Sequence, residues 1–230
     1  GEVVTLDQQD TQLGQGESIK DTIKVLSQYS DIIMYRGTAQ QRLDDIVSVS
    51  NVPIINGLTD RSHPCQIMAD IMTLEEKFES LVNLNIAWVG DGNNVCNSWI
   101  HACNHFDFNF NVSTPIEFKP ELSGQKKIKY FENPKDAVKN SDVVITDTWL
   151  SMGMKNKEER LSKFKGFQVN KELMKNANDN AVFLHCLPAH RGEEVTDEVI
   201  DSKNSLVWKE AHNRLHIQKA IMLWSLYLDF

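Results

Sequence analysis

The fold is decided by one stretch near the middle of the chain, Asn85-Ile86-Ala87-Trp88-Val89-Gly90-Asp91-Gly92-Asn93-Asn94-Val95. Its first five residues form a short, mostly apolar run that is typical of a buried β-strand. A glycine-rich turn follows, and residues 97–104 continue as a helix. A strand, a tight turn and a helix in this order are the unit from which α/β folds are built.

The same alternation extends in both directions. Further strands are predicted at residues 3–6, 31–35, 52–55, 108–112, 127–131, 142–146 and 181–184. Helices are predicted after an N-cap at Ser18, at residues 40–47, from Pro64 as first helical residue, and at the end of the chain. The last helix carries an apolar stripe of Ile217, Ile221, Trp224 and Leu228. Residues 151–166 are polar and predict a mobile loop followed by a short helix.

This pattern predicts an α/β protein with two doubly wound parallel-sheet domains, because one compact sheet would not hold so many strands. We expect a first domain at residues 1–82, a second at 83–208, and a C-terminal helix at 209–230 that packs back on the first. The chain enters a strand-like run directly after Gly1, so the first domain is expected to be incomplete at its N-terminus.

The charge, cysteine content and hydrophobicity of the chain disfavour several kinds of partner and site. The 230 residues carry a formal net charge of -8, which disfavours nucleic acid as a partner. Four cysteines without C-x-x-C spacing argue against a disulfide framework and a structural zinc site, and indicate a reducing, cytoplasmic compartment. The chain has no apolar run of the ~18 residues that a membrane helix needs, so no membrane partner is expected.

Polar residues follow five of the predicted strands. They are Arg36-Gly37, Asn56-Gly57, Gly90-Asp91-Gly92-Asn93-Asn94, Asp147 and His185-Cys186. Ligands of open α/β sheets bind outside the carboxyl ends of the strands, so these residues mark the expected site.

Each motif also has a simpler interpretation. Gly90-Asp91-Gly92 resembles a dinucleotide-binding turn, but Val95 stands where a small residue is needed, and a turn that presents Asn amides is favoured. His63-Pro64-Cys65-Gln66 enters a helix, where an anion site and an ordinary capped start are both open. Asp147 is either a ligand carboxylate or a turn residue.

His185 and Cys186 suggest thiol chemistry at first. Neighbours in a strand point to opposite faces, so the adjacency does not establish a catalytic pair. Arg36 and Arg214 are ordinary surface residues by default, although Arg36 at a strand end is a plausible anion clamp.

Taken together, these segments resemble the ornithine carbamoyltransferase family. The resemblance rests on Gly16-Glu17-Ser18-Ile19-Lys20-Asp21-Thr22, Tyr35-Arg36-Gly37, Asn56-Gly57-Leu58-Thr59-Asp60, His63-Pro64-Cys65-Gln66, Gly90-Asp91-Gly92-Asn93-Asn94, Asp147 to Gly153, His185-Cys186-Leu187-Pro188 and Arg214. The segments occur in the family's order and span nearly the whole chain. The resemblance implies transfer of a carbamoyl group from carbamoyl phosphate to L-ornithine, giving L-citrulline and phosphate, without a cofactor or metal.

The resemblance also implies roles for individual residues. Carbamoyl phosphate would be held by Arg36, His63, Gln66 and Arg214, by the backbone carbonyls of Cys186 and Leu187, and by Gln12 of a neighbouring subunit. Ornithine would be held by Asn94, Asp147, Ser151 and Met152. The catalytic residues would be Cys186, Arg214, His63 and Arg36. Family members form trimers or multiples of trimers, which implies a homotrimer active in arginine metabolism.

One departure from the family is large. Its Ser-Thr-Arg-Thr phosphate loop precedes the first strand, and this sequence holds no such segment. We expect a missing leading segment. The alternative is a catalytically inactive ligand-binding or assembly module of the same fold.

Overall fold

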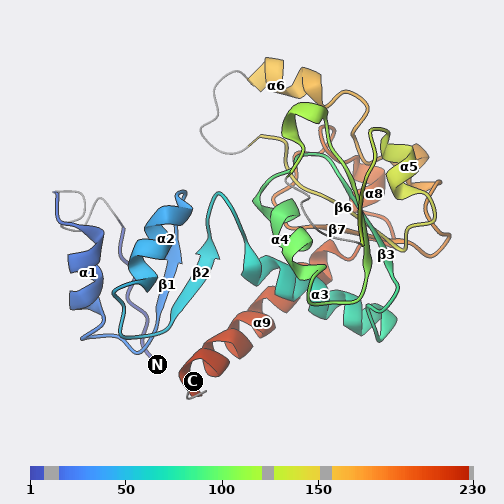
Figure 1. Cartoon of the computed structure of the whole chain (residues 1–230). Helices are drawn as coiled ribbons and strands as arrows, with labels where there is room; N and C mark the ends of the chain where they lie inside the picture. The colour runs from blue at the N-terminus through green and yellow to red at the C-terminus, as the bar shows by residue number, and fades with distance from the viewer. Residues whose placement is uncertain (8–15, 121–126, 151–156, 228–230) are drawn as a thin grey trace. The chain divides into compact units, whose positions relative to one another are not determined.

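The computed structural model describes residues 1–7, 16–120, 127–150 and 157–227. The chain divides into two compact units, and each has a parallel sheet (Figure 1). Unit 1 comprises Gly1–Arg61 and Gln218–Phe230, and unit 2 comprises Ser62–Ile217. Two parallel sheets confirm the predicted fold class.

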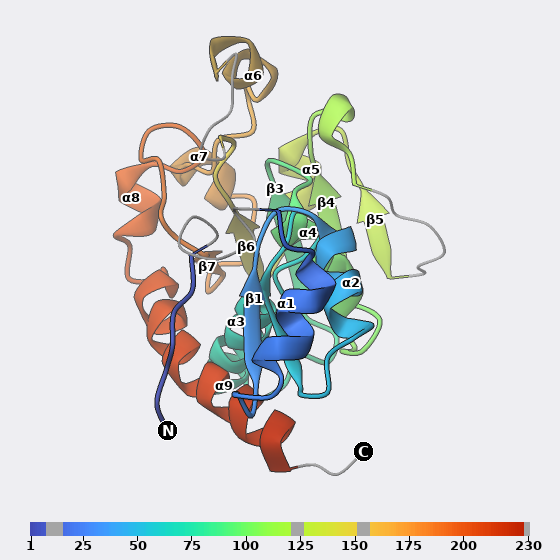
Figure 2. The same ribbon diagram turned by 90° about the vertical axis from the view of Figure 1, so that its left-hand side faces the viewer.

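Unit 1 is built on two parallel strands, β1 (Ile33–Arg36) and β2 (Ile54–Leu58). Helix α1 (Ile19–Leu26) packs against α2 (Gln40–Val47), as Figure 2 shows. The Ser18 hydroxyl accepts a hydrogen bond from the backbone N–H of Asp21 at 3.2 Å, which satisfies a free donor at the start of α1. The predicted N-cap is therefore confirmed.

Unit 2 holds a five-stranded parallel sheet in the order β5-β4-β3-β6-β7. The strands are β3 (Asn85–Val89), β4 (Asn109–Ser113), β5 (Ile128–Tyr130), β6 (Val143–Thr146) and β7 (Val182–His185). The chain runs outward from β3 to β5 and then returns to β6 on the other side of β3. The strand order therefore reverses between β3 and β6, which is where ligands of such sheets bind.

Helices cover both faces of this sheet. Helices α3 (Pro64–Phe78) and α4 (Asn94–Ala102) pack on one face, and α5 (Pro134–Val138), α7 (Lys171–Met174) and α8 (Asp197–Ile200) on the other. The remaining helices after residue 62 are the 3-10 helix η3 (Ile116–Phe118), α6 (Lys157–Lys163) and α9 (Val207–Tyr227). Helix α9 begins in unit 2 and ends in unit 1. Within the described residues, no helix has both the length and the apolar character needed to cross a membrane.

Alternation along the strands explains this layering. In β3, Ile86 and Trp88 pack into one core with α3 and α4. Ala87 and Val89 point the other way, into a second core with residues of α5, α7 and α8. Strands with two buried faces carry continuous apolar runs, as the sequence of β3, β6 and β7 does.

One prediction about an element was wrong. Residues 3–6 form no strand, and Val3 is 91% exposed, because these residues pair with no neighbouring strand. In the apolar stripe of the last helix, Ile217 and Ile221 are half-buried and Trp224 is 55% exposed, while Leu228 lies outside the described residues. The short helix predicted in residues 151–166 is confirmed as α6.

Candidate active site

The carboxyl ends of β3, β6 and β7 bring Gly90, Asp147 and Cys186 to one edge of the sheet in unit 2. These strands are parallel neighbours, so residues far apart in the sequence meet there. Gly90 has a φ of +130°, a conformation that side chains rarely adopt. A Cβ atom at this position would lie 3.0 Å from both Thr146 Oγ1 and Trp149 Nε1, so the turn needs glycine.

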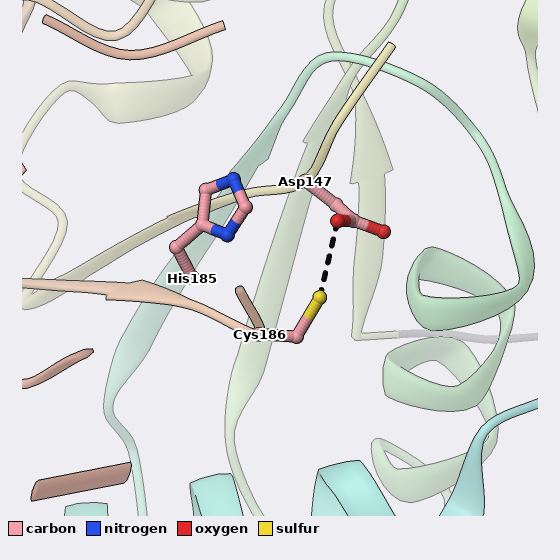
Figure 3. A group of neighbouring side chains, drawn as sticks. All are labelled: Asp147, His185 and Cys186. Carbon is pink, nitrogen blue, oxygen red and sulfur yellow. Dashed lines mark hydrogen bonds between the residues drawn. The ribbon is translucent and has the colours of Figure 1, made fainter. Parts of the chain in front are cut away.

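Asp147 is the centre of this edge (Figure 3). Its Oδ1 accepts hydrogen bonds from the thiol of Cys186 at 3.0 Å and from the backbone N–H of Thr148 at 2.7 Å. Its Oδ2 accepts one from the side-chain amide of Asn93 at 2.7 Å. Asp147 is buried, so a cation that replaced one of these partners would meet a carboxylate in a largely dry site.

Asn93 belongs to the polar turn that the sequence predicts at this site, but no ligand role was predicted for it individually. Its Oδ1 caps α4 by accepting from the backbone N–H groups of Val95 and Cys96, while its Nδ2 binds Asp147. The side chain thus joins the helix start to the carboxylate. The signal was an Asn directly before a helix, which is typical of an N-cap. Asn94, selected from the sequence, is the first residue of α4 and half-buried.

Cys186 is a neutral thiol in this setting. Burial raises the pKa of Cys186 well above its usual value, and the adjacent Asp147 carboxylate raises that pKa further. The thiolate is the nucleophilic form of cysteine, so this environment opposes nucleophilic catalysis by Cys186.

His185 is occupied elsewhere. Its Nε2 lies 3.1 Å from a carboxylate oxygen of Glu194, and its Nδ1 accepts from the backbone N–H of Leu187 at 2.9 Å. An accepting Nδ1 leaves the ring proton on Nε2, directed at Glu194. With both ring nitrogens occupied, His185 is a structural support for the strand end and not the base of a thiol pair.

Arg160 fixes the chain beside this edge. Its Nε donates to the carbonyl of Trp149 at 2.6 Å, and its guanidinium forms an ion pair with Asp91. The guanidinium also lies 4.2 Å from the ring centroid of Phe118. Burial raises the pKa of Asp91 to about 6, although Arg160 opposes this shift. The predicted ornithine residues Ser151 and Met152 lie outside the described residues, as does Gln12.

A second group of predicted residues meets where α3 and α9 pack together. Arg214 donates a hydrogen bond to the side-chain oxygen of Gln66. The amide nitrogen of Gln66 donates to Asp70 at 2.8 Å and to Glu210 at 2.7 Å. Asp70 and Glu210 are fully buried and were not selected from the sequence. The structure therefore brings Gln66 and Arg214 together within a larger polar network.

His63 precedes α3 and is buried. Its backbone N–H donates to the hydroxyl of Ser98 at 2.7 Å, and that hydroxyl donates to the carbonyl of Asn94 at 2.8 Å. The start of α3 is thereby linked to the start of α4. Arg36 is the last residue of β1 and is exposed. It lies in unit 1, whereas His63, Gln66 and Arg214 lie in unit 2.

Two groups of described residues bring potential metal-ligand atoms within 4.8 Å of one another, namely Asp147, His185 and Cys186, and His190, Glu193 and Glu194. In the first group, the hydrogen bonds of Asp147, His185 and Cys186 already engage the donor atoms. A metal ion there would have to displace these bonds.

Comparison with known families matches both halves of the chain. The family model "Aspartate/ornithine carbamoyltransferase, carbamoyl-P binding domain" matches residues 1–76. The model "Aspartate/ornithine carbamoyltransferase, Asp/Orn binding domain" matches residues 82–225. The resemblance inferred from the sequence motifs is confirmed.

Individual relatives agree. The chain is 50% identical to the ornithine carbamoyltransferase of Nitrobacter winogradskyi over 98% of its own length and 76% of that protein. It is also 50% identical to that of Caulobacter vibrioides, over 94% of this chain and 71% of the relative. The crystal structure of the ornithine carbamoyltransferase from Thermus thermophilus matches with a TM-score of 0.90 at 38% identity, over 96% of this chain and 75% of that chain. The Pyrococcus furiosus enzyme also gives 0.90, at 44% identity and the same two coverages.

Proposed function

This chain belongs to the aspartate/ornithine carbamoyltransferase family, and from that premise we infer that it transfers the carbamoyl group of carbamoyl phosphate to the side-chain amine of L-ornithine. The products are L-citrulline and phosphate. One observation carries this assignment: about half of the residues are identical to ornithine carbamoyltransferases over nearly the whole chain.

We propose that the edge around Asp147 holds ornithine. The carboxylate of Asp147 would pair with the α-ammonium group of the amino acid, assisted by Asn94, Ser151 and Met152. Support comes from the burial of Asp147, because a charge-assisted hydrogen bond in a dry site is stronger than one in water. Asn93 would keep this carboxylate oriented through its 2.7 Å hydrogen bond.

We propose that Gln66 and Arg214 hold carbamoyl phosphate together with His63, Arg36 and Gln12. The contact between Gln66 and Arg214 supports this, because it places an amide oxygen beside a guanidinium. The carbonyl oxygen of a carboxamide accepts the N–H of a carbamoyl group, and a guanidinium donates to phosphate oxygens.

Carbamoyl transfer requires the side-chain amine of ornithine in its neutral form, because a protonated amine has no lone pair for attack. The amine nitrogen attacks the carbonyl carbon, a C–N bond forms, and the C–O bond to phosphate breaks. The amine loses one proton, and the leaving phosphate can take it up. Arg36 and His63 would stabilise the negative charge that develops on the carbonyl oxygen. Cys186 would lie beside the attacking amine as a neutral thiol, and the carbonyls of Cys186 and Leu187 would orient the carbamoyl NH2.

We further propose a homotrimer, or a multiple of trimers, in which Gln12 serves the neighbouring subunit, acting in the cytoplasm in arginine metabolism. We assign residues 1–82 to the carbamoyl-phosphate domain, 83–208 to the ornithine domain, and 209–230 to a helix that returns to the first domain. Light scattering of the purified protein tests the assembly, and a monomer at all concentrations would exclude it.

Citrulline formation tests the activity. The chain as given should be assayed with ornithine and carbamoyl phosphate, in parallel with a longer form that carries an upstream phosphate loop. We expect the longer form to produce citrulline. If it binds ornithine but forms no citrulline, the alternative of an inactive ligand-binding module is correct.

A further inference from the structure

The side-chain amide of Gln66 is held in one orientation by its neighbours. Both of its N–H groups are engaged, one by Asp70 Oδ1 at 2.8 Å and one by Glu210 Oε1 at 2.7 Å. Its oxygen accepts from Arg214. An amide rotated by half a turn would direct its oxygen at two carboxyl groups and lose both bonds. The hydrogen bonds to the two carboxyl groups therefore fix the orientation of the amide, with its oxygen facing Arg214.

Asp70 and Glu210 accept from the same nitrogen of Gln66, at 2.8 and 2.7 Å, which brings the two carboxyl groups side by side. Each is 1% exposed, so bulk solvent does not screen the two groups from each other. An ionised carboxylate can only accept hydrogen bonds, and two ionised carboxylates in a dry site repel each other. A hydrogen bond between the two side chains requires that one of them carries a proton.

Glu210 reaches the other half of the site as well. Its Oε2 accepts from the backbone N–H of His185 at 3.1 Å, at the end of β7 and one residue before Cys186. One side chain of α9 thus contacts both Gln66 and the strand end that carries Cys186.

We propose that Asp70 and Glu210 share one proton and act as a positioning pair, which orients the Gln66 amide and holds the end of β7 in place for carbamoyl transfer. This inference rests on the proposed function of Gln66 and Cys186. Neither carboxyl group is assigned a contact with substrate.

The charges around the pair are consistent with one proton. Arg214 on α9 and Asp147, directly after β6, are the charged groups that act on the two carboxyls, and the Cys186 thiol is the neighbouring group that the pair affects. Burial raises the pKa of Asp70 to about 7. Burial, and then the charge of Asp70, raise the pKa of Glu210 well above its usual value. One retained proton leaves a single negative charge to balance Arg214. Loss of that proton would add a second negative charge beside a phosphate site.

Two substitutions at Glu210 separate positioning from simple loss of structure. Glu210→Gln keeps the shape and can donate to Asp70, but its NH2 group replaces one of the two oxygens that accept from Gln66 and His185, so one of these contacts is lost. Glu210→Ala removes both contacts. Near neutral pH, we expect Glu210→Gln, which keeps one of the two contacts, to raise the KM for carbamoyl phosphate by only about threefold, and Glu210→Ala to raise it by about tenfold or more. Wild-type affinity should fall at alkaline pH as the shared proton is lost, and Glu210→Gln should lack that loss.

Glu76→Gln is the matched control. Glu76 also joins α3 to α9, through Asn213 at 2.8 Å and Lys209 at 3.1 Å, but it contacts neither Gln66 nor β7. It should leave the KM for carbamoyl phosphate and its pH profile unchanged. If Glu210→Gln is as impaired as Glu210→Ala, or if Glu76→Gln is impaired equally, the positioning role is overturned.

Infrared spectroscopy tests the proton without substrate. A protonated carboxylic acid has a carbonyl band distinct from carboxylate bands. The wild type should show such a band near neutral pH, and Glu210→Gln should lack it. Absence of the band in the wild type overturns the shared proton. A band that behaves as expected in a protein that forms no citrulline would support the pair and contradict the proposed function.

Discussion

At the scale of single residues, Asp147 shows how the fold concentrates charge. Its carboxylate is buried, yet it keeps three hydrogen-bond donors from three different segments, the start of α4, its own loop and the end of β7. Several hydrogen-bond donors offset the free-energy cost of burying a charge, so Asp147 can remain an ionised carboxylate that binds a cationic ligand.

Asp147→Asn should weaken ornithine binding. The substitution removes the charge but keeps the shape, so the loss should equal a charge-assisted hydrogen bond of about 1.5–3 kcal/mol. Calorimetry with ornithine measures it. Asp142→Asn is the control, because Asp142 lies just before the same strand, at its opposite end, and accepts from the backbone N–H of Asn85. Unchanged ornithine affinity in Asp147→Asn would remove Asp147 from the binding site.

Cys186 should be alkylated slowly at neutral pH. Only the thiolate reacts, and burial together with Asp147 raises the pKa of Cys186, so the thiolate fraction grows only at more alkaline pH than for a free cysteine. Peptide mass spectrometry after iodoacetamide treatment over a pH series gives the rate at this residue, with a cysteine-containing peptide as reference. A rate profile that matches the reference peptide would show that the thiol is not buried beside a negative charge.

The sequence predicted only some of the residues that form the site. Asp147 and Cys186 stand directly after apolar strands, and that position alone places them at the binding edge. Asp70 and Glu210 lie inside helices at positions without such a signal. Their roles come from the packing of α3 against α9. These helices are far apart in the sequence: Asn213 of α9 contacts Thr73 of α3, 140 residues earlier. A local sequence pattern does not reveal which distant helix will pack against it.

At the scale of elements, Arg160 links α6 to the turn after β3 and to the chain after β6. Arg160 binds the carbonyl of Trp149 and the carboxylate of Asp91, while its guanidinium lies over Phe118. Trp149 and Phe164 stack with ring centroids 4.9 Å apart. The residues on either side of 151–156 are therefore fixed to each other and to the turn after β3.

Arg160→Ala should impair ornithine binding more than carbamoyl phosphate binding. It frees Trp149 and leaves the buried Asp91 without its cation, so the flanks of Ser151 and Met152 lose their anchor. We expect the KM for ornithine to rise by about tenfold with little change for carbamoyl phosphate.

Lys163→Ala is the control for that experiment. Lys163 lies on the same helix and pairs with Glu117 on the exposed surface, where ion pairs contribute little. Equal effects of the two substitutions on the ornithine KM would show that α6 as a whole matters, and would contradict a specific role of Arg160.

Helices and strands that carry a clear hydrophobic pattern in their own sequence were predicted correctly. A strand that requires a neighbouring strand to pair with was not. Residues 85–89 are a strand in both the prediction and the structure, since their apolar run is buried on both faces. Residues 3–6 are also rich in β-branched side chains, but no strand of the described residues lies beside them, and a strand without a partner leaves its backbone groups unpaired.

At the scale of the whole molecule, the two units differ in how their sheets are protected. Strands β6 and β7 are buried along their entire length, and β3 is buried after Asn85. In unit 1, β1 alternates between half-buried and exposed residues, and β2 is only half-buried. Among the described residues of unit 1, β1 and β2 pair only with each other, so each has hydrogen bonds on one side and its amides should open at lower free energy.

Amide hydrogen exchange should therefore separate the units. Peptides that contain β3 or β6 should exchange roughly a hundredfold more slowly than peptides that contain β1 or β2, after correction for intrinsic rates. Mass spectrometry of the chain as given measures this, and a repeat at a second pH checks that exchange reports the opening equilibrium. Ornithine should slow exchange further at the carboxyl ends of β6 and β7 if Asp147 binds it there. Equal protection of both sheets would mean that the two units open as a single cooperative structure.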